Sequence, residues 1–191
     1  MRIAVMVAAG LMVLAGCAGR ARAEMDPAAV AAPTRAEQLA LALAAAASAE
    51  AAGDRQALGQ AVALIDRLGA HPLAGAADDP LGAWRSNAAF TDPPLRGRTL
   101  GPGYRSGRIA AGSKESFAQL FLSGTGAQIA VSAPNGGRVA MRVIDPQART
   151  ICQGEANHGG TCRWVPLFTQ RYTIEVANLS NEDVRYFLVV D

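Results

Sequence analysis

Arg171-Tyr172-Thr173-Ile174-Glu175-Val176 is the stretch that decides the fold, because polar and apolar side chains alternate along it. This two-residue period is typical of a β-strand that faces a core on one side and solvent on the other. Residues 186–190 predict a last strand that is apolar on both faces. Further strands are expected at 115–122, 128–131, 139–143, 149–153 and 162–165, with a turn at Pro134-Asn135-Gly136-Gly137. Short strands separated by turns in this way predict an antiparallel β-sandwich.

The second half of the chain also resembles a known family in the order of its strand motifs. The motifs are Ser106-Gly107-Arg108-Ile109, residues 112–117, 126–131 and 139–146 (which ends in Asp145-Pro146), 171–176 and 186–190. Together they resemble the bacterial pre-peptidase C-terminal domain, a jelly-roll-like β-sandwich appended to many secreted proteins. The resemblance covers residues 107–190 and implies that fold. Members of the family often carry acidic residues that can bind calcium, and residues 178–183 form the comparable cluster here, which we interpret as a solvated turn or a calcium site.

The first half predicts a pair of antiparallel helices. Thr34 and Glu37 have the spacing of a capping box, and Gly53 followed by Asp54 ends one helix and begins the next. The second helix carries one apolar stripe, formed by Leu58, Ala61, Val62, Ile65 and Leu68. This stripe must lie either on the second half of the chain or on another chain. We therefore expect a mainly β protein with an N-terminal α-helical hairpin at 34–70, a linker at 71–105 and a jelly-roll-like β-sandwich at 106–191.

The two halves carry opposite charge. Residues 25–83 hold three arginines and seven acids, whereas residues 84–191 hold twelve basic residues and eight acids. The whole chain has a net charge of only +2, which does not favour nucleic acid as a partner. One explanation of the imbalance is that arginines just before the sandwich pair with acids of the hairpin.

The N-terminus predicts export. Residues 1–16 form a signal peptide, with one arginine followed by an uncharged apolar run too short to span a bilayer. The run ends in Leu14-Ala15-Gly16-Cys17, which resembles the bacterial lipobox and implies acylation of Cys17, with residues 17–33 as a tether. Ala18 after the cysteine implies export to the outer membrane. The alternative is cleavage after Ala21-Arg22-Ala23, which would release a soluble periplasmic protein.

Two cysteines remain after the lipobox. In an oxidising compartment Cys152 and Cys162 predict a disulfide between neighbouring strands. The alternative is a metal site that includes His158, but three ligands at this spacing are unusual for zinc. We expect no metal and no cofactor.

The sequence contains no motif of an enzyme family. A nucleophile elbow, a P-loop, a zincin histidine pair and a dinucleotide-binding glycine motif are all absent. A hydrolase that uses paired carboxylates would have Glu115, Asp145 and Glu175 as candidates, although any sandwich carries such acids on its outer face. We expect no catalytic residues.

Arginine and aromatic residues supply a candidate binding surface. Its members are Arg105, Arg108, Arg163, Trp164 and Arg171. Arg96 and Arg98 lie close to the first two in sequence. Guanidinium groups bind anionic groups in bidentate fashion, and aromatic rings stack on sugars or side chains. The alternative is that the arginines form internal ion pairs while Trp164 fills the core.

These observations favour a non-catalytic cell-envelope lipoprotein, an accessory or adhesive module that binds a protein or glycan partner. Two alternatives remain open. One is a small secreted or periplasmic hydrolase, and the other is a structural subunit that assembles through its helical hairpin. The sequence does not define an oligomeric state.

Overall fold

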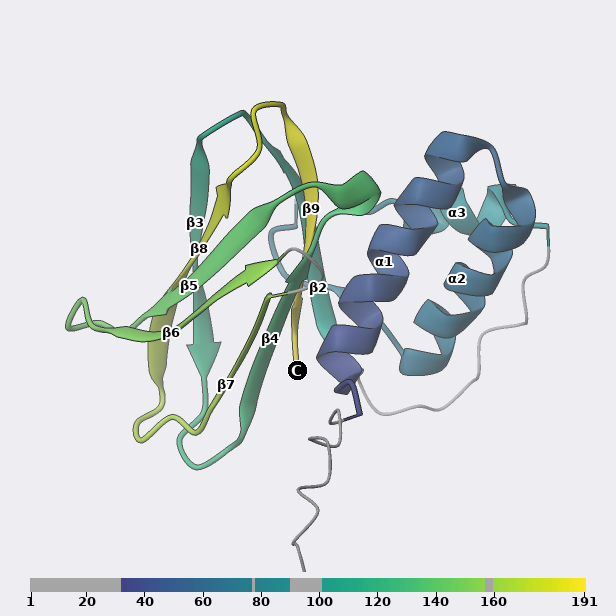
Figure 1. The fold of residues 1–191 in the computed structure, drawn as a ribbon. Coiled ribbons are helices and arrows are strands. Elements are labelled where there is room, and N and C mark those ends of the chain that lie inside the picture. The colour runs from purple at the N-terminus through teal and green to yellow at the C-terminus, as the bar shows by residue number, and fades with distance from the viewer. Residues whose placement is uncertain (1–31, 77, 90–100, 157–159) are drawn as a thin grey trace, which may run out of the picture. The chain divides into compact units, whose positions relative to one another are not determined.

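The described part of the chain is built from two β-sheets and a layer of helices (Figure 1). The computed structural model describes residues 32–76, 78–89, 101–156 and 160–191. All of its helices and strands lie in one unit, Pro33–Asp191. None of the described helices is long and apolar enough to cross a membrane.

The strands form a five-stranded sheet A and a four-stranded sheet B. Sheet A has the order β1-β2-β9-β4-β7, with β1 His71–Pro72, β2 Gly103–Ile109, β9 Val184–Val190, β4 Ala127–Ser132 and β7 Gly160–Trp164. Sheet B has the order β3-β8-β5-β6, with β3 Lys114–Phe121, β8 Gln170–Asn178, β5 Val139–Ile144 and β6 Thr150–Ala156. Every strand pair is antiparallel except β1 with β2. The predicted antiparallel β-sandwich with an N-terminal helical pair is therefore confirmed.

The alternating stretch at 171–176 lies within β8, and its period separates the two faces of sheet B. Tyr172, Ile174 and Val176 are buried in the core between the sheets, whereas Arg171 and Thr173 are exposed. Strand β9 is buried on both faces for a different reason. Tyr186 and Leu188 face the core between the sheets, while Phe187 and Val189 face the helices.

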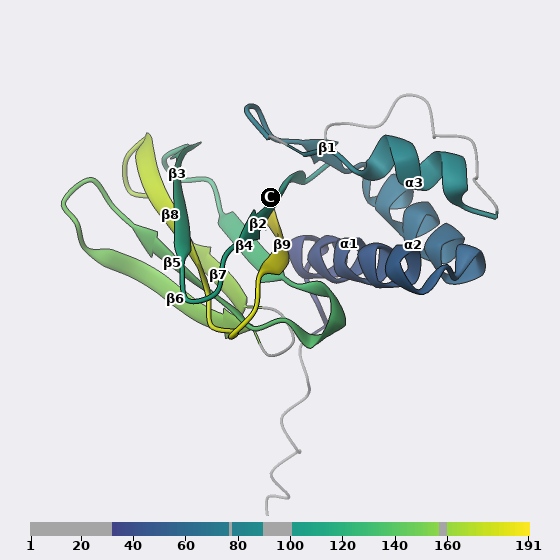
Figure 2. The same ribbon diagram turned by 90° about the horizontal axis from the view of Figure 1, so that it is seen from above.

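The helical hairpin forms as its local signals predict. Helix α1 spans Arg35–Ala52 and begins with the Thr34–Glu37 capping box, and Gly53 ends it at φ 69°. Asp54 then caps α2, Arg55–Leu68. Helix α1 contacts β4 and β9 on the outer face of sheet A (Figures 1 and 2). The buried apolar side chains of α1 therefore pack against sheet A and α2, whereas the stripe of α2 packs on α1 and α3.

The segment at 71–105, which we predicted as a linker, contains β1, α3 and the start of β2. Strand β1 pairs with β2, and helix α3, Leu81–Asn87, packs on α2. Trp84 of α3 is fully buried, with its ring 5.9 Å from that of Phe187. The proline and glycine content of this segment is typical of a linker, but Trp84 supplies enough apolar surface to hold α3 in the core.

Candidate functional site

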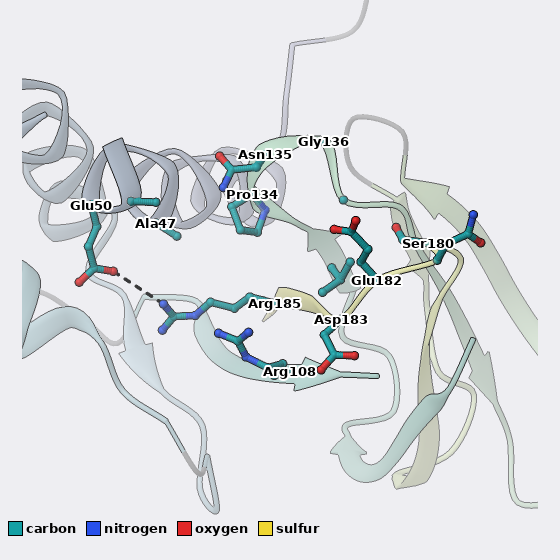
Figure 3. Close-up of a pocket in the computed structure, with 14 residues that line it drawn as sticks. Ala47, Glu50, Arg108, Pro134, Asn135, Gly136, Ser180, Glu182, Asp183 and Arg185 are labelled. Carbon is teal, nitrogen blue, oxygen red and sulfur yellow. Dashed lines mark ion pairs between the residues drawn. The ribbon is translucent and has the colours of Figure 1, made fainter. Parts of the chain in front are cut away.

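A hollow that could receive a partner lies at one end of the sandwich. It is a cleft of about 630 Å³ between α1, the turn at η1 (Pro134–Gly136), the β8–β9 turn and the adjoining ends of β2 and β9. Figure 3 shows Glu50 of α1 on one side of the cleft, and Glu182 and Asp183 of the β8–β9 turn on the other. Arg108 and Arg185 lie between these acids. We refer to this hollow as the cleft.

Arg185 is held in place by contacts on several sides. Its guanidinium forms ion pairs of 2.8 Å with Asp78 and 3.7 Å with Glu50. It also lies 5.2 Å from the ring centre of Phe187 and 5.7 Å from that of Trp84. These contacts fix the guanidinium while leaving its side chain 23% exposed.

Arg108 has a different environment although it lies directly beside Arg185. The two residues are cross-strand partners in the β2–β9 pair, so both side chains leave the same face of sheet A. Arg108 is exposed and forms no ion pair with any described residue, whereas Arg185 is paired with two acids. Like charges that face each other across strands are unfavourable unless an anionic group lies near them. Arg108 is therefore the cation in the cleft that is available to a ligand.

Asn178 stabilises the β8–β9 turn at the rim of the cleft. Its buried side-chain amide donates to the carbonyl oxygens of Ile109 at 3.0 Å and Glu182 at 2.7 Å. Its side-chain oxygen accepts from the backbone N–H of Ser180 at 2.8 Å. The described residues contain no group of three or more side chains that could hold a metal ion. These bonds favour the interpretation of residues 178–183 as a turn closed by its own side chains, rather than as a calcium site.

The other members of the predicted binding surface do not lie beside Arg108. Arg105 is on the opposite face of β2, where it pairs with Glu115 at 3.0 Å and lies 4.9 Å from the ring centre of Phe117. Arg163 is on β7, at the far edge of sheet A, and forms a 3.6 Å ion pair with Glu37. The five residues thus point to separate places, because Arg105 and Arg108 leave opposite faces of β2, β7 is the far edge of sheet A and β8 belongs to sheet B.

Trp164 and Arg171 are also separated. The Trp164 ring packs edge-on against Phe121 and Tyr172, with ring centres 4.8 Å and 5.6 Å away. Arg171 leaves the outer face of sheet B, because its neighbour Tyr172 faces inward. Trp164 therefore contributes to an aromatic cluster of the core instead of offering a stacking platform.

Among the described residues, two acids of the hairpin pair with arginines that we did not expect in this role. Arg105 pairs within the sandwich, and Arg96 and Arg98 lie outside the described residues. The hairpin acids Glu37 and Glu50 instead pair with Arg163 and Arg185. Sequence reasoning missed Arg185, although an arginine at the start of a strand that is otherwise apolar on both faces was a usable signal.

The three carboxylates considered for a hydrolase are each engaged by cations or hydrogen bonds. Glu115 accepts from Tyr186 Oη at 2.8 Å and pairs with Arg105. Bonds from Arg142 and Lys114 lower the pKa of Glu175. Burial acts to raise the pKa of Asp145, but hydrogen bonds from the backbone and guanidinium of Arg149 outweigh it, and this pKa is also lowered.

Glu175 and Asp145 are therefore poor general acids. A general acid needs a pKa near the working pH, and neither Glu175 nor Asp145 is moved in that direction. The carboxylate of Glu115 accepts a hydrogen bond from Tyr186. Burial is the main cause that raises the pKa of this phenol, and the hydrogen bond to Glu115 raises it further.

Cys152 of β6 and Cys162 of β7 form a disulfide. Because β6 belongs to sheet B and β7 to sheet A, the bond joins the two sheets at one edge of the sandwich. His158, considered above as a metal ligand, lies outside the described residues. The same is true of Cys17, of the lipobox and of the alternative cleavage site at Ala23.

The fold defines the chain as a two-sheet β-sandwich protein with a helical layer on one sheet. No family model matches it, and no curated protein matches it in sequence. Solved structures do match it over about half of its length. The pre-peptidase C-terminal domain of a collagenase from Bacillus anthracis is 19% identical and is similar over 46% of this chain and 87% of its own, with a TM-score of 0.41.

Two other solved structures are similar to this chain over a comparable share of its length. A periplasmic inhibitor of g-type lysozyme from Aeromonas hydrophila is 15% identical over 47% of this chain and 84% of its own, with a TM-score of 0.40. A mitogen derived from Yersinia pseudotuberculosis is 10% identical over 47% of this chain and 83% of its own, also at 0.40.

Proposed function

We propose that this protein is an exported, non-catalytic binding module, and that a segment of a protein partner occupies the cleft. The observation that carries the proposal is the pair of cross-strand arginines in the cleft, of which Arg185 is neutralised by two acids and Arg108 is not. An acidic side chain or a terminal carboxylate of the partner would complete the pairing of Arg108.

The remaining lining of the cleft favours a peptide segment as the occupant. Glu182 and Asp183 are exposed on the opposite side from Glu50, so the cleft presents both signs of charge to a ligand. A peptide, with its amides and mixed charges, matches such a lining. A glycan would instead be expected to meet an exposed aromatic platform, and Trp164 lies in the aromatic cluster.

A binding role without catalysis is supported by the state of the carboxylates. Glu115, Asp145 and Glu175 each have a cationic partner in the fold. The export part of the proposal rests on the signal peptide and on the disulfide, which is typical of an oxidising compartment. We extend it to a lipoprotein anchored through Cys17, facing the periplasm or the cell surface.

The proposal is tested by crosslinking in intact cells. A photoreactive amino acid at Asn135 or Glu182, both exposed on the rim, should form a discrete protein adduct. The same probe at Gln60 or Thr173, which are exposed elsewhere, should not form it. Adducts shared by all four positions, or none from either rim position, would contradict a protein partner in the cleft.

Charge reversal sharpens the test. Arg108→Glu should abolish the adduct from both rim positions, because it replaces the available cation with a carboxylate. Arg138→Glu is the matched control, since Arg138 is an exposed arginine outside the cleft and has no ion pair among the described residues. An adduct that survives Arg108→Glu, or is lost equally in both variants, would refute the role of Arg108. Loss of labelled palmitate in Cys17→Ser separately tests the anchor.

A further inference from the structure

Exposed apolar side chains gather at the end of the sandwich opposite the cleft. Among the described residues, eight large apolar side chains are exposed, and six of them lie at this end. They are Leu120, Leu122, Ile151, Val165, Leu167 and Phe168, and we call this set the apolar end. Leu167 is 80% exposed and Phe168 70%, so the tip projects into solvent. A cluster of this kind indicates an interaction surface.

The tip is held in shape by the neighbouring β3–β4 turn. The hydroxyl of Ser123 donates to the carbonyl oxygen of Leu167 at 2.8 Å, and the N–H of Ser123 donates to Thr169 Oγ1 at 3.0 Å. The N–H of Gly124 donates to the carbonyl oxygen of Pro166 at 2.9 Å. The exposure of Leu167 and Phe168 is therefore a property of a braced loop.

The start of the described chain lies at the same end of the molecule. Glu37, in the first turn of α1, pairs with Arg163, which is two positions before Val165. Figure 1 shows the beginning of α1 and the β3–β4 and β7–β8 connections on the same lower side. The 17 residues from Cys17 to Pro33 span at most about 60 Å when extended. An acyl chain on Cys17 would therefore keep the apolar end within reach of the bilayer.

The charges around the tip suit a lipid surface. Arg149 lies beside the hollow of about 400 Å³ behind Phe168, and its side chain is 74% exposed. Arg171 is exposed on the neighbouring strand, and Asp145, the acid that lines this hollow, is 1% exposed and paired with Arg149. Apolar side chains flanked by arginine are typical of segments that enter the interface of a bilayer.

We propose that the apolar end docks on the surface of a lipid bilayer, with Leu167 and Phe168 inserted among the acyl chains and Arg149 and Arg171 at the level of the head groups. This contact adds to the anchor at Cys17 and is independent of the cleft. Because the acyl chains on Cys17 would be joined to the domain only through residues 17–33, a second hydrophobic contact would fix the orientation of the domain on the bilayer.

Vesicle binding tests the proposal without the anchor. The chain beginning at Glu24, purified from the periplasm, keeps every described helix and strand, since all lie within Pro33–Asp191. It should sediment with vesicles of phosphatidylcholine that contain about a quarter of phosphatidylglycerol. The double variant Leu167→Ser/Phe168→Ser should lower the partition coefficient at least about tenfold. The control Leu41→Ser/Leu179→Ser removes two exposed leucines from elsewhere and should leave it unchanged.

A fluorescence measurement separates insertion from other uses of the same surface. In F168W the new indole should be quenched by brominated acyl chains, beyond the quenching of the parent chain, whose Trp84 is fully buried and whose Trp164 is half-buried beside the same hollow. Failure of the parent chain to bind vesicles, or equal losses in the two double variants, would overturn the proposal. So would lipid-free self-association that Leu167→Ser/Phe168→Ser abolishes, because the apolar end would then belong to a second copy.

Discussion

Removal of the Cys152–Cys162 disulfide should lower the free energy of unfolding. The number of residues between the two cysteines determines the size of this loss. The two residues are 10 positions apart, and closing a loop of this size removes about 9 cal/mol/K of entropy from the unfolded chain. At room temperature this corresponds to about 2.7 kcal/mol. For a unit of this size, 1 kcal/mol shifts the melting temperature by about 2–4 °C, so we expect a loss of about 5–11 °C.

The measurement compares three samples of the chain that begins at Glu24, in which Cys152 and Cys162 are the remaining cysteines. Thermal unfolding is followed by circular dichroism for the oxidised parent, the reduced parent and the double variant Cys152→Ala/Cys162→Ala. Reduction removes only the crosslink and so measures its effect alone. The variant also removes two sulfur atoms, one of them from Cys162, which is 1% exposed in the core. Reductant should leave the double variant unaffected.

Two results would refute this reasoning. A shift of less than about 2 °C on reduction would mean that the crosslink does not limit the unfolded chain as the entropy argument requires. A shift far above about 11 °C would mean that separating β6 from β7 opens the sandwich edge itself. In that case the bond between the sheets would act mainly in the native state, and the stability of the reduced protein would be set by the contacts of β7 with β4.

Other predictions follow from the core and the ion pairs. Trp84→Ala should cost about 3–5 kcal/mol in urea unfolding, because it empties a fully buried site against Phe187; an effect near zero would contradict the placement of α3. The lowered pKa of Glu175, whose ordinary value is about 4.5, stabilises the fold above that pH and loses its contribution as the pH falls through the lowered value. Glu175→Gln should therefore be less stable at neutral pH and should lose less stability on acidification below about pH 4.5; equal acid profiles would contradict this.

Local signals in the sequence predicted the elements that depend on local structure. The alternation at 171–176 marks β8, and the capping box of Thr34 and Glu37 begins α1. Each of these features is decided by residues within a few positions of one another. The disulfide was predictable for a related reason, since Cys152 and Cys162 fall on strands joined by a short connection.

The candidate site was less predictable because sheet order depends on contacts between distant residues. Arg105 and Arg108 are three positions apart on one strand and therefore point to opposite faces, so only Arg108 reaches the cleft. Arg163 and Arg171 were grouped with them by composition, yet β7 and β8 belong to different sheets. Arg185 enters the site only because β9 pairs with β2, which no local pattern shows.

Strand β3 connects the two surfaces and gives their separation. The N–H of Ala111, just before β3, donates to Asp183 at the cleft, whereas Leu122, just after it, belongs to the apolar end. Eight residues of strand between them span about 27 Å. A bilayer in contact with the apolar end would thus leave the cleft facing away from the lipid, open to a partner from the aqueous side. Leu167→Ser/Phe168→Ser should then lower vesicle binding at least about tenfold while the rim position Glu182 still crosslinks to its partner. If one variant removed both properties, the membrane contact would be part of partner binding, and the two surfaces would have to be assigned to a single function.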